Sequence, residues 1–194
     1  IVSAMKEARI LYGATDLGAP HFSGDILWRT KFRVPDPVFL VEVGGKVYLF
    51  ASALEFGRAK KEARVDAVVL SDGGVGQVSQ FLKAKRVRRV IVPDGFPYRI
   101  AEGLRKEFRV SAKPPPFYPE RMRKTHWEII QIHAAQQAAG RALKKAMEFL
   151  RSSRIRGRRV WNGKRAVTSE ELRKIIDDSL YADGYLGIDT IISC

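Results

Sequence analysis

A glycine-rich loop in the first half of the chain has residue types that could bind a phosphate group. Residues 71–76 read SDGGVG, between a short apolar run and a stretch of helical periodicity. At such a turn, backbone amides and the start of a helix can face an anion. However, Ser79 stands where a dinucleotide fingerprint has its third glycine, and no Gly-Lys-Ser/Thr follows. We therefore interpret the loop as a simple turn that uses the conformational freedom of glycine.

The histidines do not have the spacing of a metal site. They are His21, His126 and His133, and no His-Glu-x-x-His pair is present. His126 and His133 are seven residues apart on an expected helix, which is too far for them to share one ion. His21 lies in a connection rich in glycine and proline, a kind of segment that often carries function. A structural or solvent-facing role is favoured for all three.

Acidic residues and nucleophiles also give no complete catalytic set. Asp177 and Asp178 are adjacent on an expected helix, so their side chains diverge by about 100°. Asp183 and Asp189 follow, and we interpret these carboxylates as solubilising and turn-forming groups. No Gly-x-Ser-x-Gly elbow occurs, and Cys194 is the last residue. The sequence therefore assigns no catalytic, cofactor-binding or metal-binding residue.

The chain is strongly basic, with a formal net charge of +14 and a pI near 10.2. Basic clusters can bind phosphates, but no zinc-finger, RNP-like or helix-turn-helix pattern accompanies them. A solvated surface or pairing between domains is favoured, and a nucleic-acid-binding module stays open as the alternative. The first cluster comprises Lys83, Lys85, Arg86, Arg88 and Arg89, and the second comprises Arg151, Arg154, Arg156, Arg158, Arg159, Lys164 and Arg165.

Strands and helices alternate through the first half, which predicts a three-layer α/β domain with a mixed sheet. Gly44-Gly45 indicates a tight hairpin, and Ser52 with Glu55 fits a capping box. A short helix over residues 3–9 is the alternative to the first strand. The connection 16–37 should hold one helical or extended piece near residues 26–28. Expected strands are 8–14, 37–43, 46–51, 66–70, 89–93 and 109–112, and expected helices are 52–64, 76–85 and 97–108.

Prolines in residues 113–119 end this domain, and the remainder is mainly helical. Thr125 and Glu128 form a capping box ahead of a helix expected to reach Arg151. Its small and aliphatic side chains recur at helical spacing, so this stripe needs covering by another element. A basic loop, a second helix from Thr168 and a strand-like run over residues 188–194 follow.

Several short motifs, in order along the chain, resemble the Xaa-Pro aminopeptidase, prolidase and creatinase family, the pita-bread metallopeptidases. They are residues 35–40 (PDPVFL), the Gly44-Gly45 hairpin, residues 54–59 (LEFGRA), residues 121–125 (RMRKT) with Glu128 and Ile129, residues 168–172 (TSEEL) and residues 190–193 (TIIS). The resemblance implies a creatinase-like N-terminal α/β domain over residues 1–116. It also implies a linker and the truncated start of a pita-bread α+β catalytic domain over residues 117–194.

The resemblance further implies a parent enzyme that cleaves short peptides next to proline with two divalent ions, commonly Mn, Co or Zn. The ligands of the family, which are two aspartates, a histidine and two glutamates, lie beyond the position matched by Ser193. We therefore expect no cofactor in this chain, which should be inactive alone. Its own contribution would be substrate gating and dimerisation, as a homodimer.

Compartment and membrane association follow from composition. The apolar runs are far shorter than the roughly twenty residues that a membrane helix needs. The N-terminal residues do not read as a signal peptide, and a single cysteine suits a reducing compartment. We expect a cytoplasmic protein without membrane contact.

Overall fold

The computed structural model describes residues 6–193, which divide into two compact units. Unit 1 ends at Met122 and unit 2 begins at Arg123. Phe117 and Tyr118 are buried against one face of the unit 1 sheet, after the expected boundary at residue 116. The domain division into 1–116 and 117–194 therefore stays a prediction. In the structure, unit 1 continues past residue 116 and ends at Met122. No helix among the described residues is both long enough and apolar enough to span a membrane.

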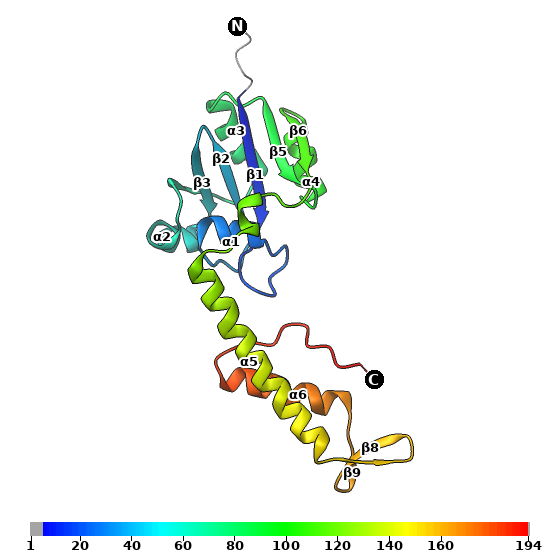
Figure 1. Ribbon diagram of the computed structural model, residues 1–194. Coiled ribbons are helices and arrows are strands. Elements are labelled where there is room, and N and C mark those ends of the chain that lie inside the picture. Colours follow the sequence, from blue (N-terminus) through cyan, green and yellow to red (C-terminus); the bar gives the residue numbers. More distant parts are fainter. Residues whose placement is uncertain (1–5, 194) are drawn as a thin grey trace. The chain divides into compact units, whose positions relative to one another are not determined.

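Unit 1 is a six-stranded mixed sheet with helices on both faces (Figure 1). The strand order is β4-β3-β2-β1-β5-β6, and β2 alone runs against the others among the described strands. The strands are β1 (Glu7–Gly13), β2 (Val38–Val43), β3 (Lys46–Ala51), β4 (Ala67–Leu70), β5 (Arg89–Pro93) and β6 (Arg109–Lys113), and the helices are α1 (Gly24–Thr30), α2 (Ala53–Glu62), α3 (Val75–Ala84), α4 (Tyr98–Arg105) and the 3-10 turn η1 (Pro119–Met122).

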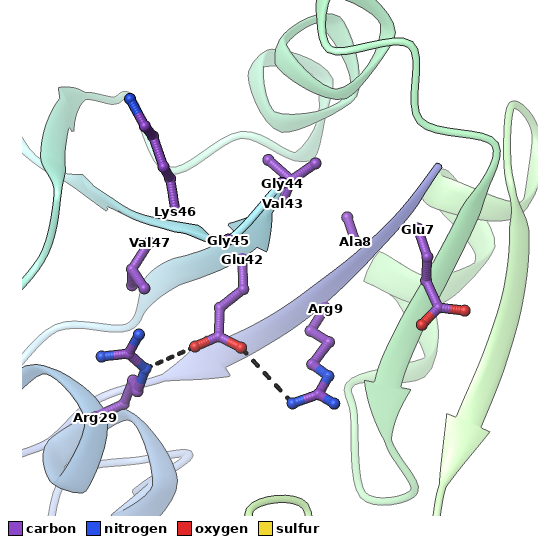
Figure 2. A pocket seen from close by; sticks show the side chains of 10 residues that line it. All are labelled: Glu7, Ala8, Arg9, Arg29, Glu42, Val43, Gly44, Gly45, Lys46 and Val47. Atoms are coloured by element: carbon purple, nitrogen blue, oxygen red, sulfur yellow. Dashed lines mark hydrogen bonds and ion pairs between the residues drawn. The ribbon is translucent and has the colours of Figure 1, made fainter. Parts of the chain in front are cut away.

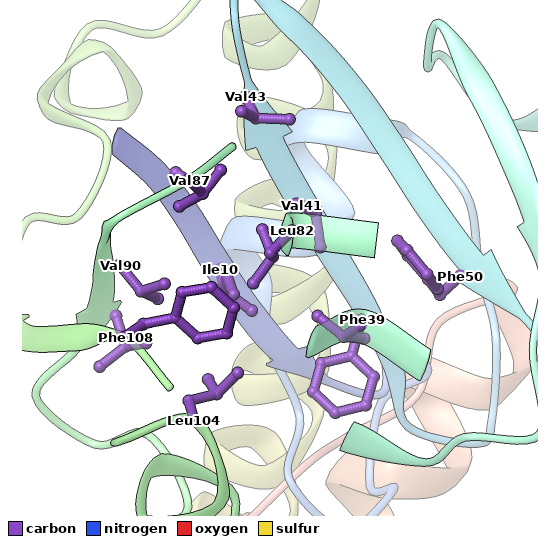
Figure 3. Close-up of a cluster of buried hydrophobic side chains, with 13 residues drawn as sticks. Ile10, Phe39, Val41, Val43, Phe50, Leu82, Val87, Val90, Leu104 and Phe108 are labelled. Atoms are coloured by element: carbon purple, nitrogen blue, oxygen red, sulfur yellow. The ribbon is translucent and has the colours of Figure 1, made fainter. Parts of the chain in front are cut away.

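Each face of the sheet has its own apolar core because side chains of successive strand residues point to opposite faces. On one face, Ile10 and Val41 pack with Leu82 of α3 and Leu104 of α4 (Figure 3). On the other face, Leu40 packs with the residues of α1 and α2 and with Phe117 and Tyr118. This arrangement confirms the predicted three-layer α/β fold.

The hairpin and the first strand confirm the sequence prediction. Gly44 and Gly45 have φ angles of 61° and 75°, which glycine reaches without the steric penalty of a side chain. Residues 7–9 belong to β1, so the alternative helix over residues 3–9 is wrong where it is described, and residues 3–5 lie outside the described residues. The piece near residues 26–28 is helical, as α1, and Ser23 caps it by accepting from the Ile26 amide.

The expected capping box at Ser52 is wrong. The helix α2 does begin after Ser52, but that side chain accepts no amide hydrogen. The carboxylate of Glu55 is buried and forms an ion pair with Arg58 at 3.0 Å. An arginine one turn later therefore competes successfully with the free backbone amide for this carboxylate.

Unit 2 consists of two helices and a small sheet. The elements are α5 (His126–Arg151), β7 (Arg154–Arg156), β8 (Arg159–Asn162), β9 (Arg165–Ala166) and α6 (Ser169–Ala182). The predicted capping box at Thr125 is confirmed, with both reciprocal hydrogen bonds to Glu128. The segment expected to be a basic loop is instead an antiparallel sheet of three strands, a correction to the sequence prediction.

The prediction of a strand over residues 188–194 is also wrong where the chain is described. Residues 188–193 adopt no strand, and Cys194 lies outside the described residues. Thr190 donates a hydrogen bond to Asp177 of α6 at 2.8 Å, so a side chain holds this segment in place. A lone apolar run pairs as a strand only where a neighbouring strand offers its backbone groups, and no described residue does so here.

Candidate functional site

The carboxyl ends of five strands of unit 1 meet at one edge of the sheet. The strands β1, β3, β4, β5 and β6 share one direction. The helices α1 and α2 cover one face of the sheet, and α3 and α4 cover the other. In open α/β sheets, ligands bind in crevices at this edge, where the chain changes the side to which it winds. Two hollows lie there, and they are the candidate functional site.

The first hollow, of about 260 Å³, opens beyond the ends of β1 and β5. His21, Asp25, Asp94 and Arg121 line it together with apolar side chains. The loop that carries His21 packs closely on the end of β1, because a Cβ at Gly13 would lie 2.4 Å from the His21 carbonyl oxygen. Its backbone is held by the Ala14 amide, which donates to that oxygen at 3.1 Å. The fold thus fixes His21 at the rim of a hollow.

Charges in this hollow are satisfied within the protein. Arg121 donates to Asp25 at 2.5 Å, which joins residues of α1 and η1 that are 96 positions apart in the sequence. Asp94 accepts from the Gly95 amide at 2.8 Å. Within residues 6–193, no group of three His, Cys, Asp or Glu side chains comes together as metal ligands would. Asp25, Asp94 and Arg121 therefore use these contacts to hold the rim of the hollow together.

The second hollow, of about 430 Å³, is more apolar. Pro37, Phe39 and Phe50 line it, with Asp36 and Asp72 among its polar residues. An apolar surface with a few polar groups is the usual composition of a small-ligand pocket. Its chemistry suits an apolar side chain or ring.

The glycine-rich loop of residues 71–76 borders this second hollow but uses its own amides. Gly73 donates to the Ser71 hydroxyl at 3.0 Å, and Gly74 donates to the Asp72 carboxylate at 2.8 Å. A carboxylate already accepts the hydrogen bond that a phosphate would need, and its negative charge repels an anion. The geometry supports the interpretation of a simple turn.

A third hollow, of about 270 Å³, lies at the opposite edge, beside the Gly44-Gly45 hairpin. Figure 2 shows Glu42 between two arginines, with Arg29 Nε at 2.7 Å and Arg9 Nη1 at 4.0 Å. Burial, and next the Glu42 carboxylate, raise the pKa of the Tyr118 phenol above its ordinary value. A phenol that stays protonated cannot act as a base. We therefore interpret Glu42, its two arginines and Tyr118 as a structural cluster.

The remaining candidates from the sequence do not come together. Asp178 pairs with Lys174 at 2.7 Å, and Asp183 accepts two hydrogen bonds from Arg141 at 2.7 and 2.8 Å. His126 and His133 are exposed along α5. Asp177 is held by Thr190, and Asp189 is exposed with a φ of 55°. Each carboxylate thus serves a local contact or faces solvent.

The two basic clusters differ sharply. In the first, Lys83 pairs with Glu107 at 2.9 Å and Arg89 with Glu7 at 3.4 Å, while Lys85 lies over the rings of Tyr48 and Phe81. In the second, all seven cations are exposed, and none has an ion pair among the described residues. Within the described residues, the first cluster thus has part of its charge paired inside unit 1, whereas the second has none of its seven cations in an ion pair.

Two groups in these hollows were missed by sequence reasoning. Arg9 of β1 is directly opposite Glu42 of β2. An alignment of the first strand with the hairpin in the sequence could have predicted this pair. The pair of Asp25 and Arg121 has no local signal, because it depends on where the chain returns after β6.

Comparison with solved structures shows what this fold is similar to. The prolidase from Pyrococcus furiosus matches 91% of the chain with a TM-score of 0.66 and 16% identity. The Xaa-Pro dipeptidase from Bacillus anthracis matches 92% with a TM-score of 0.68 and 15% identity. The X-Pro aminopeptidase from Thermotoga maritima matches 92% with a TM-score of 0.65 and 13% identity.

The chain spans about half the length of these structures, 45% of the first two and 47% of the third. No protein-family model and no curated protein matches the sequence. At such identities the likeness shows the fold, and it confirms the structural resemblance that the sequence motifs predicted. Because the matches cover at least 91% of the chain, they include residues of both units.

Proposed function

We propose that this chain is the N-terminal portion of an Xaa-Pro peptidase-like metallohydrolase, whose parent cleaves short peptides next to proline. The observation that carries the proposal is the structural match, which runs through both units yet spans only about half of each peptidase. A chance likeness of a common α/β fold would be expected to cover unit 1 alone.

The surface of unit 2 supports this proposal. Long apolar side chains are exposed along α5, including Ile129, Ile130, Leu143 and Met147. A helix with an apolar stripe is stabilised by packing that stripe on another element. The α+β sheet of a hydrolase domain would cover it, as a helix layer covers a sheet in other two-layer domains.

The metal centre of the parent family does not fit the described residues. A two-metal site needs several carboxylates converging on ions about 3.5–4 Å apart. Two aspartates of unit 2, Asp177 and Asp183, are engaged by Thr190 and Arg141, and no described group of three His, Cys, Asp or Glu side chains comes together. We therefore derive no catalytic step from this chain and expect it to hydrolyse no Xaa-Pro dipeptide by itself when Mn²⁺, Co²⁺ or Zn²⁺ is added.

The contribution of the chain would be substrate gating and dimerisation. The hollows at the carboxyl edge of unit 1 suit gating, because one is apolar enough to accept a proline ring and the other carries polar groups at its rim. Dimerisation is tested by light scattering coupled to gel filtration. A dimer at micromolar concentration supports this role, and a monomer contradicts it.

The test of the proposal is the gene sequence that follows codon 194. We expect an open frame that supplies two aspartates, a histidine and two glutamates in the order of the pita-bread enzymes, and a longer protein that hydrolyses Xaa-Pro dipeptides when Mn²⁺ is added. A stop codon at that position, with no such sequence nearby, would contradict the proposal.

A further inference from the structure

The small sheet of unit 2 gathers basic side chains on one face. In the register of β7 and β8, Arg154 is opposite Trp161 and Arg156 is opposite Arg159. Paired residues share a face, and so do residues two apart on a strand. One face therefore carries three arginines and a tryptophan, which we call the arginine face: Arg154, Arg156, Arg159 and Trp161.

The arrangement of charge on this face is unfavourable without an anion. Arg156 and Arg159 are directly opposite each other, and like charges in this position destabilise a strand pair. The turn between them adds Arg158, while Gly157, with a φ of 62°, makes the turn possible. No described acid forms an ion pair with any of these arginines. Such a pair of strands would gain stability from a negatively charged ligand.

The sheet is fixed to the end of α5, so the face is presented in a defined position within unit 2. Asn162 donates to the hydroxyls of Ser152 and Ser153, each at 3.3 Å. The Ser153 hydroxyl in turn donates to the Phe149 carbonyl at 2.9 Å. On the following segment, the Val167 amide donates to the Val160 carbonyl at 2.9 Å.

We propose that the arginine face binds single-stranded nucleic acid. Guanidinium groups bind phosphate oxygens through paired hydrogen bonds, and alternate arginines on two strands follow an extended backbone. The half-buried indole of Trp161, on the same face, offers a surface on which a base can stack. An acidic protein would contact the arginines but would have no base to stack on the indole of Trp161. The combination of arginines and tryptophan therefore favours nucleic acid over an acidic protein. This proposal is independent of the peptidase proposal.

The test is fluorescence anisotropy of a labelled single-stranded oligonucleotide titrated with the chain at several salt concentrations. Binding should weaken as salt rises, with a slope in log affinity of about 0.7 per neutralised phosphate. The triple variant R154Q/R156Q/R159Q should lower affinity at least about tenfold and reduce that slope by about 2. Trp161→Ala should weaken binding by about fivefold or more, while Trp161→Phe, which keeps a stacking ring, should retain most of it.

A matched control removes the same number of charges elsewhere. Arg99, Lys106 and Arg109 are exposed cations of unit 1, and no described acid forms an ion pair with them. The variant R99Q/K106Q/R109Q has the same net charge as the triple arginine variant and should bind almost as wild type. Equal losses in the two variants would show attraction by net charge alone and overturn the proposal.

Three further outcomes would also overturn it. They are absence of binding at low salt, binding that Trp161→Ala leaves unchanged, and equal binding to an acidic polypeptide such as polyglutamate. The conservative variant R154K/R156K/R159K, which keeps the charges of the strands, guards against misfolding as the cause of a loss. Circular dichroism of each variant should match that of the wild type.

Discussion

Unit 1 buries phenylalanines and branched aliphatic side chains on both faces of its sheet, whereas the side chains that unit 2 buries, within the described residues, are Ala138, Ala142, Ala146 and Ser179. Unit 2 nevertheless has long apolar side chains, and several of them are exposed on α5. Burial of apolar area is the main favourable contribution to folding. Unit 1 therefore has a core of its own, while unit 2 has a surface suited to packing against further protein.

The largest expected effect comes from truncating one isoleucine in each unit. Ile10 on β1 is fully buried, so Ile10→Ala should destabilise unit 1 by about 2–5 kcal/mol. Ile130 on α5 is 48% exposed, so Ile130→Ala should cost no more than about 0.5 kcal/mol. Urea unfolding is followed through Trp28 for unit 1, and through Trp127 and Trp161 for unit 2, with the other tryptophans replaced by phenylalanine. An equal loss of unfolding free energy in the two units would contradict the inferred difference between their cores.

A second prediction concerns the packing of α5 against α6 inside unit 2. Ala142 is fully buried on α5, so Ala142→Leu should overpack the contact and cost about 1–3 kcal/mol. Ala139, exposed on the same helix, is the matched control, and Ala139→Leu should be nearly neutral. The helical signal in circular dichroism during thermal unfolding separates the two. A neutral Ala142→Leu would mean that the helices do not pack closely in solution.

A third prediction is a pH dependence confined to unit 1. The raised pKa of Tyr118 means that the folded state holds the phenolic proton more tightly than the unfolded chain, in which tyrosine titrates near 10. The resulting stability is fully present below about pH 10 and falls by about 1.4 kcal/mol per pH unit above it. Tyr118→Phe should therefore flatten the decline of unit 1 stability above that pH.

Tyr181 is the control for this effect, because it is 74% exposed on α6. Urea midpoints of unit 1 between pH 8 and 11 for wild type, Tyr118→Phe and Tyr181→Phe make the comparison. The account would be contradicted if Tyr118→Phe kept the slope of the wild type, or if Tyr181→Phe removed it.

The smallest expected effect compares the helix starts of the two units. Thr125 caps α5 with both bonds of a capping box, so Thr125→Ala should destabilise unit 2 by about 1 kcal/mol. Ser52 stands at the start of α2 without a side-chain cap bond, so Ser52→Ala should change unit 1 by a few tenths of a kcal/mol at most. Chemical denaturation of each unit measures both. A larger cost at Ser52 would show that the cap forms in solution.

The fold of unit 1 could be predicted because its signals are local. Gly44-Gly45 specifies a hairpin, and apolar runs rich in β-branched residues, such as residues 89–93, have the composition of buried strands. The similar run at residues 66–70 predicts a strand correctly but not its burial, because β4 is an edge strand whose Leu70 is 52% exposed. The short strands of unit 2 gave no such signal. Arginines at alternate positions of β7 read as a polar loop, because strand prediction depends on buried side chains and Ile155 of this strand is 80% exposed.

The candidate site was less predictable than the fold. His21 was identified as the histidine in a functional type of loop, and it does line a hollow. Its neighbours Asp94 and Arg121 come from the ends of other elements, and their approach is set by tertiary packing. The two basic clusters look alike in the sequence. In the structure they differ because Glu7 and Glu107 pair with two cations of the first cluster and aromatic rings contact Lys85.

The comparison between the units is tested most directly by hydrogen exchange of the whole chain in native buffer, read by mass spectrometry on peptides from β1, β2 and α5. The account predicts strong protection of β1 and β2 and exchange of the α5 amides faster by at least about two orders of magnitude, because opening α5 exposes little additional apolar area. Equal protection of α5 and the central strands would show that unit 2 has a complete core of its own and would contradict the account.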